Sequence, residues 1–197
     1  MTLQKVHSGK VRDVYDAGDD LLLMVTSDRI SAFDVVMHEP IRDKGRVLTG
    51  ITAFWLEAVS DLAPSHLVSV DPADFPPGAA DLGDLDGRAM LVRRADMLPI
   101  ECIVRGYVAG SAWKEYQASG TIHGQPVPAG LQQSSPLPEP MFTPSTKATE
   151  GHDENISIEQ AANLVGADVV EEAQAISLAV YKRAAEEATT TGGLLLA

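Results

Sequence analysis

The sequence lacks most of the features that mark secreted, membrane-spanning or metal-clustered proteins. One cysteine, Cys102, occurs among 197 residues, which excludes an internal disulfide and a zinc site built from cysteines. The longest uninterrupted apolar run covers only residues 21–25, far too short to cross a bilayer. The first residues contain no apolar signal segment, so we expect a soluble, cytoplasmic protein.

The sequence also lacks common catalytic motifs, and it has few basic residues. The five histidines show no metal-ligand spacing, and neither a G-x-S-x-G motif nor a Cys/His nucleophile pattern is present. Lysine and arginine total 15 against 28 acidic residues, which gives a formal net charge of -13. This balance opposes binding to nucleic acid or to an anionic membrane, and we expect neither partner. An anionic ligand would need a local cluster of cations.

The pattern of apolar residues predicts strands at the start of the chain and helices at its end. Strands are expected at residues 21–26, 89–93 and 98–108, and a hairpin turn at Ser8-Gly9-Lys10. A helix is expected between residues 45 and 64, with its apolar stripe facing a core. Two later helices are expected, one after a Ser157–Gln160 capping box and one starting near Asp168 and stopped by Gly192-Gly193. Residues 71–87 and 124–140 are expected as loops because they are rich in proline and glycine.

Cations beside glycine occur in two motifs. In Gly9-Lys10-Val11-Arg12 the backbone could approach a phosphate that the cations neutralise, although an exposed hairpin explains the motif better when it is taken alone. In Asp43-Lys44-Gly45-Arg46 two cations oppose the dipole of the following helix, and an anionic ligand would resolve that conflict. Between them, residues 27–34 place hydroxyls and carboxylates directly after a strand, as a binding edge or as a plain turn.

Two further segments offer carboxylates. Alternation along residues 98–108 puts Glu101 and Arg105 on one face, either as an ion pair or as a ligand site. The loop His152-Asp153-Glu154-Asn155 has ligands that suit magnesium, and a solvated loop leading to the Ser157 cap is the alternative.

The segment LPIECIVRGYVAGS at residues 98–111 closely resembles the diagnostic segment of the SAICAR synthetase (phosphoribosylaminoimidazole-succinocarboxamide synthase) family of purine biosynthesis. Further segments resemble the same family in the same order, at residues 8–15, 27–34, 43–48, 142–147 and 152–157. A chance match to this ordered set, which spans nearly the whole chain, is improbable.

The resemblance implies an α+β fold of two lobes. A β-rich N-terminal lobe with a phosphate-binding hairpin is expected over residues 1–93, and a partial α+β lobe that binds ATP over residues 94–197. The implied reaction joins L-aspartate to the carboxylate of 5-amino-1-(5-phosphoribosyl)imidazole-4-carboxylate (CAIR), uses ATP and Mg²⁺, and gives SAICAR, ADP and phosphate.

Roles for particular residues follow from the same resemblance. The residues expected to face the ATP phosphates are Gly9, Lys10, Val11 and Arg12. Glu101 and Asp153 are expected to hold Mg²⁺, and Arg105 and Ser111 to bind the phosphate or carboxylate of CAIR. Further candidates on the substrate side are Ser31, Asp34 and Lys44. The expected catalytic group is Lys10, Glu101, Arg105 and Asp153.

The family pattern continues beyond the apolar run at residues 194–197 with an Asp-Thr-Lys-Phe-Glu segment, whose Asp and Lys resemble magnesium and nucleotide groups. We therefore expect the chain to be an N-terminal portion of that pattern. The alternative function is a truncated, non-catalytic module that binds nucleotide or CAIR. A small-molecule kinase ranks last because the kinase motifs are absent. The oligomeric state, a homo-oligomer included, and the order of substrate binding stay open.

Overall fold

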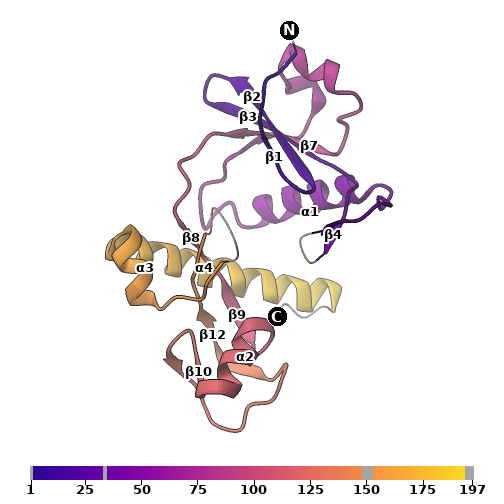
Figure 1. Ribbon diagram of the computed structural model, residues 1–197. Helices are drawn as coiled ribbons and strands as arrows, with labels where there is room; N and C mark the ends of the chain where they lie inside the picture. The colour runs from indigo at the N-terminus through magenta and orange to yellow at the C-terminus, as the bar shows by residue number, and fades with distance from the viewer. Residues whose placement is uncertain (1, 33–34, 148–152, 194–197) are drawn as a thin grey trace. The chain divides into compact units, whose positions relative to one another are not determined.

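The computed structural model describes residues 2–32, 35–147 and 153–193. The chain divides into two compact units, Met1–Asp96 and Met97–Ala197 (Figure 1). Both units contain helices and strands, and the α+β fold expected from the sequence is confirmed. The lobe assignment to residues 1–93 and 94–197 stays a prediction. The apolar run at residues 194–197 lies outside the described residues.

The first unit is built on a five-stranded antiparallel sheet with strand order β1-β2-β3-β7-β6. Its elements are β1 (Lys5–Ser8), β2 (Arg12–Gly18), β3 (Leu21–Thr26), β4 (Ser31–Ala32), β5 (Val35–Val36), α1 (Lys44–Ala58), β6 (Leu67–Ser69), the 3-10 helices η1 (Pro72–Asp74) and η2 (Pro77–Leu82), and β7 (Ala89–Arg93). The strands predicted at residues 21–26 and 89–93 are confirmed with the same bounds, as is the first hairpin.

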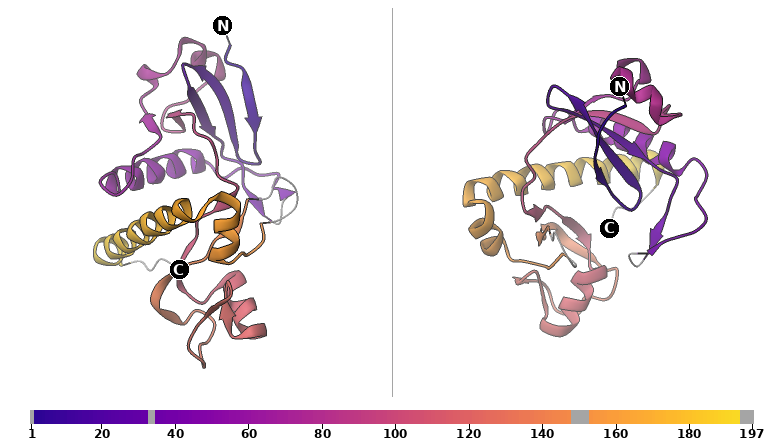
Figure 2. Two further views of the ribbon diagram at one scale, coloured as in Figure 1. Left: turned by 90° about the vertical axis from the view of Figure 1, so that its left-hand side faces the viewer. Right: turned by 45° about the horizontal axis from the view of Figure 1, so that its top comes forward.

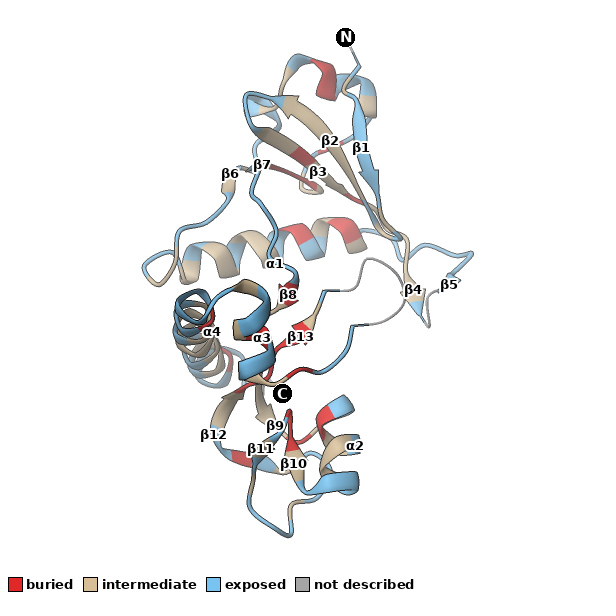
Figure 3. Ribbon diagram, turned by 60° about the vertical axis from the view of Figure 1, so that its left-hand side comes forward, coloured by how far each residue is buried: buried red, intermediate tan, exposed pale blue. Residues whose placement is uncertain are grey.

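The core of this unit lies around the two central strands, β3 and β7. Leu23 is fully buried, and the first four residues of β7 are buried as well (Figure 3). Residues 71–87, predicted as a surface loop, contain η1 and η2, and Ala79 and Leu85 pack with Leu23. Both short helices have proline at their first positions, where the fixed φ of proline favours a helical turn.

The helix α1 starts beside the end of β3. A Cβ on Gly45 would lie 2.8 Å from the carbonyl oxygen of Thr26, so glycine allows this close approach. Gly45 and Thr49 are the buried residues of α1. The prediction that its apolar stripe faces a core is wrong for much of the helix, since Val47 is 57% and Phe54 is 54% exposed. The helix meets the sheet through small residues of its first turns.

The described residues of the second unit form three two-stranded antiparallel sheets, β8–β13, β9–β12 and β10–β11, and three α-helices. Its elements are β8 (Ile100–Glu101), β9 (Val104–Tyr107), α2 (Gly110–Ser119), β10 (Thr121–Ile122), β11 (Gln125–Pro126), β12 (Pro136–Phe142), β13 (Ser145–Thr146), α3 (Ile158–Val165), α4 (Ala167–Glu187) and a π-helical turn η3 (Ala188–Gly192).

The single strand predicted at residues 98–108 is divided into β8 and β9. Glu101 pairs with Ser145 and Val104 pairs with Phe142, so one register runs through both pairs of strands. The ladder breaks where Pro144, which has no N–H, stands in the returning segment. The loop predicted at residues 124–140 also overlaps β11 and β12, because a two-stranded sheet has edges that tolerate proline.

The C-terminal helices of this unit begin largely as predicted. Gln160 N donates to Ser157 Oγ at 3.1 Å and Ser157 N donates to Gln160 Oε1 at 2.8 Å, which confirms the capping box of α3. Helix α4 instead follows Gly166 without a side-chain cap. Gly193, with φ 62°, ends the helical region. Figure 2 shows the short α3 turning into the long α4.

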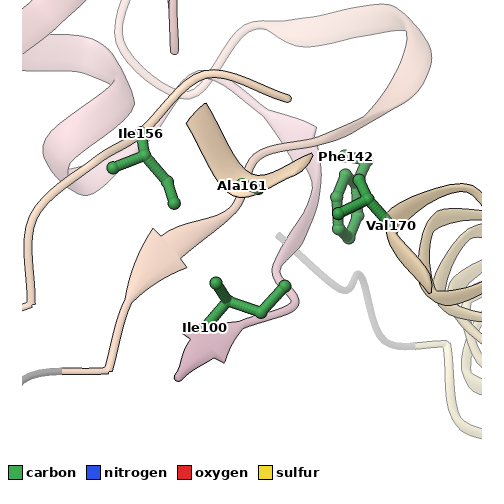
Figure 4. Packing of buried hydrophobic residues seen from close by; sticks show 5 residues of the cluster. All are labelled: Ile100, Phe142, Ile156, Ala161 and Val170. Atoms are coloured by element: carbon green, nitrogen blue, oxygen red, sulfur yellow. The ribbon is translucent and has the colours of Figure 1, made fainter. Parts of the chain in front are cut away.

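The main core of the second unit joins strands to these helices. Buried Ile100 and Phe142 from β8 and β12 pack with Ile156, Ala161 and Val170 (Figure 4). Helix α4 also lies close to β9, since a side chain at Gly106 would overlap the hydroxyl of Tyr181. Within the described residues, no helix is both long and apolar enough to cross a membrane.

Candidate functional site

The turn between β1 and β2 carries the residues predicted to bind nucleotide. The amide of Gly9 donates to the carbonyl oxygen of Arg12 at 2.7 Å, and the amide and hydroxyl of Ser27 both donate to the carbonyl oxygen of Val11 at 2.9 Å. A hollow of about 290 Å³ borders this turn and is lined by His7, Gly9, Lys10, Val11, Arg12, Val14 and Met24. The structure therefore brings the four predicted residues to one hollow with polar and apolar walls.

Asp13 fixes the shape of this hairpin. Its carboxylate accepts hydrogen bonds from Ser8 Oγ at 2.6 Å and from Lys5 Nζ at 2.9 Å, and Arg29 lies 3.8 Å away. The Ser8 hydroxyl, with help from the two cations, holds the pKa of Asp13 below its ordinary value, although burial opposes this. Lys5 is thus engaged within the hairpin.

Asp28 binds the start of α1. Its carboxylate accepts hydrogen bonds from Gly45 N at 2.9 Å, Asp43 N at 3.2 Å and Arg88 Nη2 at 2.9 Å. The Gly45 amide is the main cause that keeps the pKa of Asp28 below its ordinary value. A protein carboxylate therefore supplies the negative charge that a helix N-terminus favours.

One of the two cations at residues 43–46 has carboxylate partners within the protein. Arg46 Nη2 lies 2.7 Å from Asp84 Oδ2, and Arg46 Nη1 lies 3.5 Å from Asp86 Oδ2. An external anion is not needed to explain Arg46. The other substrate-side candidates are Ser31 in β4 and Lys44 at the start of α1, whose roles stay predictions, while Asp34 lies outside the described residues.

In the second unit, Glu101 at the end of β8 pairs with Lys147. Lys147 Nζ lies 2.6 Å from Glu101 Oε1, and this hydrogen bond, together with the charges of Glu101 and Asp153, raises the pKa of Lys147. One ammonium group therefore interacts with both carboxylates predicted to hold Mg²⁺. The sequence placed Lys147 within a family-like segment but gave no reason to pair it with Glu101, 46 residues away.

The donor chemistry here fits Mg²⁺, which proteins usually hold with one or two carboxylates together with phosphate oxygens. Glu101 is partly exposed and Asp153 is exposed, so both can reach a ligand in solvent. Among residues 2–32, 35–147 and 153–193, no group of three or more His, Cys, Asp or Glu side chains could hold a metal ion. A metal at Glu101 and Asp153 would therefore take its further oxygens from substrate and water.

Arg105 on β9 is directed to the start of α2. Its Nη2 donates to Ser111 Oγ at 3.0 Å. Burial lowers the pKa of Arg105 and the charge of Glu115 opposes that shift. A guanidinium and a helix N-terminus both favour an anion, so this corner of the unit has the chemistry of a phosphate or carboxylate site. The alternative ion pair between Arg105 and Glu101 is wrong, because Glu101 pairs with Lys147.

The four residues of the predicted catalytic group are therefore found in three separate sets of contacts. Arg105 and Ser111 touch each other, and Glu101 and Asp153 are linked through Lys147. Lys10 belongs to the first unit, at the hairpin hollow.

Comparison with known proteins gives the family of the chain. The sequence profile of SAICAR synthetase matches residues 5–197. The phosphoribosylaminoimidazole-succinocarboxamide synthase of Syntrophotalea carbinolica is 56% identical over 192 residues, which cover 96% of this chain and 64% of the relative. That of Geobacter sulfurreducens is 53% identical over 186 residues, which cover 93% of this chain and 62% of the relative.

Solved structures agree. The SAICAR synthase of Saccharomyces cerevisiae complexed with SAICAR matches with a TM-score of 0.85 and 43% identity, over 95% of this chain and 64% of that chain. The SAICAR synthetase of Pyrococcus horikoshii, at 23% identity, shares the fold with a TM-score of 0.72 over 92% of this chain and 69% of that chain. The chain spans less than two thirds of the length of the Syntrophotalea, Geobacter and yeast proteins that it matches. It belongs to the SAICAR synthetase family.

Proposed function

We propose that this chain takes part in the ATP-dependent ligation of L-aspartate to the carboxylate of CAIR, which gives SAICAR, ADP and phosphate. The yeast relative, 43% identical, is a SAICAR synthase complexed with SAICAR, which supports the substrate class. The hydrogen bond between Arg105 and Ser111 at the start of α2 is the observation that carries the proposal, because it prepares an anion site in the second unit. We place this reaction in the cytoplasm.

The chemistry explains why cations matter and why no protein nucleophile is needed. A carboxylate is a poor electrophile, so an oxygen of the CAIR carboxylate first bonds to the γ-phosphorus of ATP, and ADP leaves with the electron pair of the broken P–O bond. The amine of aspartate then attacks the carbonyl carbon of the acyl phosphate. Phosphate leaves, and the nitrogen loses a proton as the amide forms. Fixed positive groups stabilise the negative charge that develops on the phosphoryl oxygens.

The residues of this chain divide that work. Lys10 and Arg12 neutralise the ATP phosphates at the hairpin turn, where Gly9 lets the backbone approach. Arg105 and Ser111 orient CAIR through its phosphate or carboxylate, and Ser31, Asp34 and Lys44 are further candidates for binding substrate. Glu101 and Asp153 would hold Mg²⁺, which supplies positive charge to the phosphate oxygens when bound. Lys147 keeps the two carboxylates oriented.

Calorimetry followed by a turnover assay tests the proposal. We expect the purified chain to bind ATP with Mg²⁺ and to bind CAIR, and we expect SAICAR to form when L-aspartate is added. An absence of affinity for both ATP and CAIR would contradict the proposal. Saturable binding without SAICAR formation would instead support the alternative, a non-catalytic binding module.

A further inference from the structure

Glu115 connects three segments of the second unit. It lies four residues after Ser111, so both side chains share one face of α2. Its Oε1 accepts hydrogen bonds from Gly124 N at 3.1 Å and Thr121 Oγ1 at 3.3 Å, and its Oε2 accepts one from Asn155 Nδ2 at 3.4 Å. Burial acts to raise the pKa of Glu115, but the amides of Gly124 and His123 hold it below the ordinary value. A charged carboxylate thus ties α2 to the β10–β11 turn and to the segment after Asp153.

His123 makes a second connection from the same turn. His123 and Gly124 have φ of 48° and 73° and join β10 to β11 as a two-residue turn. Two positive φ values mark a type I′ turn, in which Asn, Asp and Gly are the usual residues. A positive φ is uncommon for a residue other than glycine, although histidine adopts it more readily than most, so the contacts of the His123 side chain are what indicate its role.

The contacts of His123 show what that role involves. The side chain is buried, with 3% exposed, and Nδ1 lies 2.9 Å from the carbonyl oxygen of Pro144. Because a carbonyl only accepts hydrogen bonds, Nδ1 carries the proton of the neutral ring. Nε2 is buried without a hydrogen-bond partner in the described part of the chain, as is Nε of Arg105. Burial and the charge of Arg105 lower the pKa of His123, while Glu115 opposes them.

We propose that Glu115 and His123 are positioning residues for the anion site of Arg105 and Ser111. Together they fasten α2 to the β10–β11 turn, to Pro144 next to β13, and to Asn155. The guanidinium then keeps its direction relative to Lys147, which directly follows β13, and to the segment that carries Asp153. This inference rests on the proposed function, since it takes the anion at Arg105 to be the phosphate or carboxylate of CAIR.

Substitutions at Glu115 distinguish a positioning role from the general effect of its negative charge on anion binding. Glu115→Ala removes all three hydrogen bonds, whereas Glu115→Gln keeps the shape and one acceptor oxygen. Both remove a negative charge near an anion site, which by electrostatics alone tightens anion binding in both variants. Positioning predicts the opposite for alanine, a loss of CAIR affinity of about tenfold or more, and near-complete rescue by glutamine. Glu139→Gln, an exposed residue of β12, is the matched control and should bind as the wild type does.

Calorimetric titration with CAIR, alongside a thermal unfolding curve for each variant, gives the decision. Wild-type or tighter affinity in folded Glu115→Ala overturns the inference, as does an equal loss in both Glu115 variants. A lower melting temperature with unchanged affinity also overturns it, because the role is then only structural. If the wild type does not bind CAIR, the assignment of CAIR to this site fails, and inorganic phosphate becomes the probe of the same variants. If phosphate does not bind either, both the anion site at Arg105 and Ser111 and the positioning role of Glu115 and His123 are overturned.

Discussion

Nζ of Lys147 lies 2.6 Å from Oε1 of Glu101, and its charge also interacts with Asp153. The ammonium group of Lys147 therefore attracts both carboxylates, and that of Glu101 the more strongly. In the proposed metal site Mg²⁺ would use the same two carboxylates and would compete with Lys147 for them. The metal dependence of ligand binding would then be sensitive to the loss of either carboxylate.

Glu101→Gln and Asp153→Asn should each raise the Mg²⁺ concentration needed for half-maximal binding of ATP and CAIR by more than about tenfold, because each removes one anionic oxygen ligand. Calorimetry at stepped Mg²⁺ concentrations measures this value. Glu154→Gln, beside Asp153 in the same exposed segment, is the control and should leave it unchanged. An unaltered Mg²⁺ requirement in Glu101→Gln would remove that residue from the metal site.

Arg105→Ala should weaken CAIR binding by about ten- to a hundredfold, because a hydrogen bond to a charged ligand group contributes roughly 1.5–3 kcal/mol. The fold should persist, since Arg105 bonds to the exposed residue Ser111 and not to a buried acid. The control is Arg94→Ala, which breaks only an exposed 3.3 Å pair with Asp16. Wild-type CAIR affinity in Arg105→Ala would show that the guanidinium does not contact this ligand.

Lys10→Ala should reduce ATP affinity by about tenfold or more while leaving CAIR affinity within about twofold, because Lys10 lines the hairpin hollow of the first unit. Lys5→Ala is a matched control on the same hairpin, since Lys5 pairs with Asp13 at 2.9 Å. Fluorescence titration with an ATP analogue measures both variants. Equal losses in the two variants would indicate general charge rather than a specific phosphate contact.

Local sequence signals predicted local structure well. Residues 21–26 and 89–93 are short apolar runs bounded by turns, and both became strands with those bounds. The capping box at Ser157 and Gln160 involves residues three apart, so its geometry was fully contained in the sequence. Fold class was likewise accessible, because the order of the family-like segments covers nearly the whole chain.

Features that depend on distant partners were not predictable. The break between β8 and β9 depends on Pro144, about forty residues further along, and the periodicity of residues 98–108 carries no trace of it. The apolar residues of α1 have the spacing of a helix, and the helix is present. Their spacing does not show whether another element covers them, and several of them are exposed. Lys147 and Glu115 escaped notice because their importance comes from contacts with Glu101 and Asn155, 46 and 40 residues away.

The buried imidazole of His123 predicts a specific dependence of stability on pH. Burial lowers the pKa of His123 in the folded state from its ordinary value of 6.5. The unfolded chain then binds more protons than the folded chain below that value, so the free energy of unfolding rises with pH in this window. The stabilisation from His123 is fully present above the unfolded pKa and is lost as pH falls toward the folded one.

His123→Asn isolates this contribution. Asparagine keeps an amide donor for Pro144 and tolerates a positive φ, but it cannot titrate. We expect the wild type to lose stability as the pH falls below about 6.5, and the variant to lose clearly less over the same range. Chemical denaturation followed by circular dichroism measures both slopes. Identical slopes for His123→Asn and the wild type would mean that the imidazole is not held neutral in the folded protein.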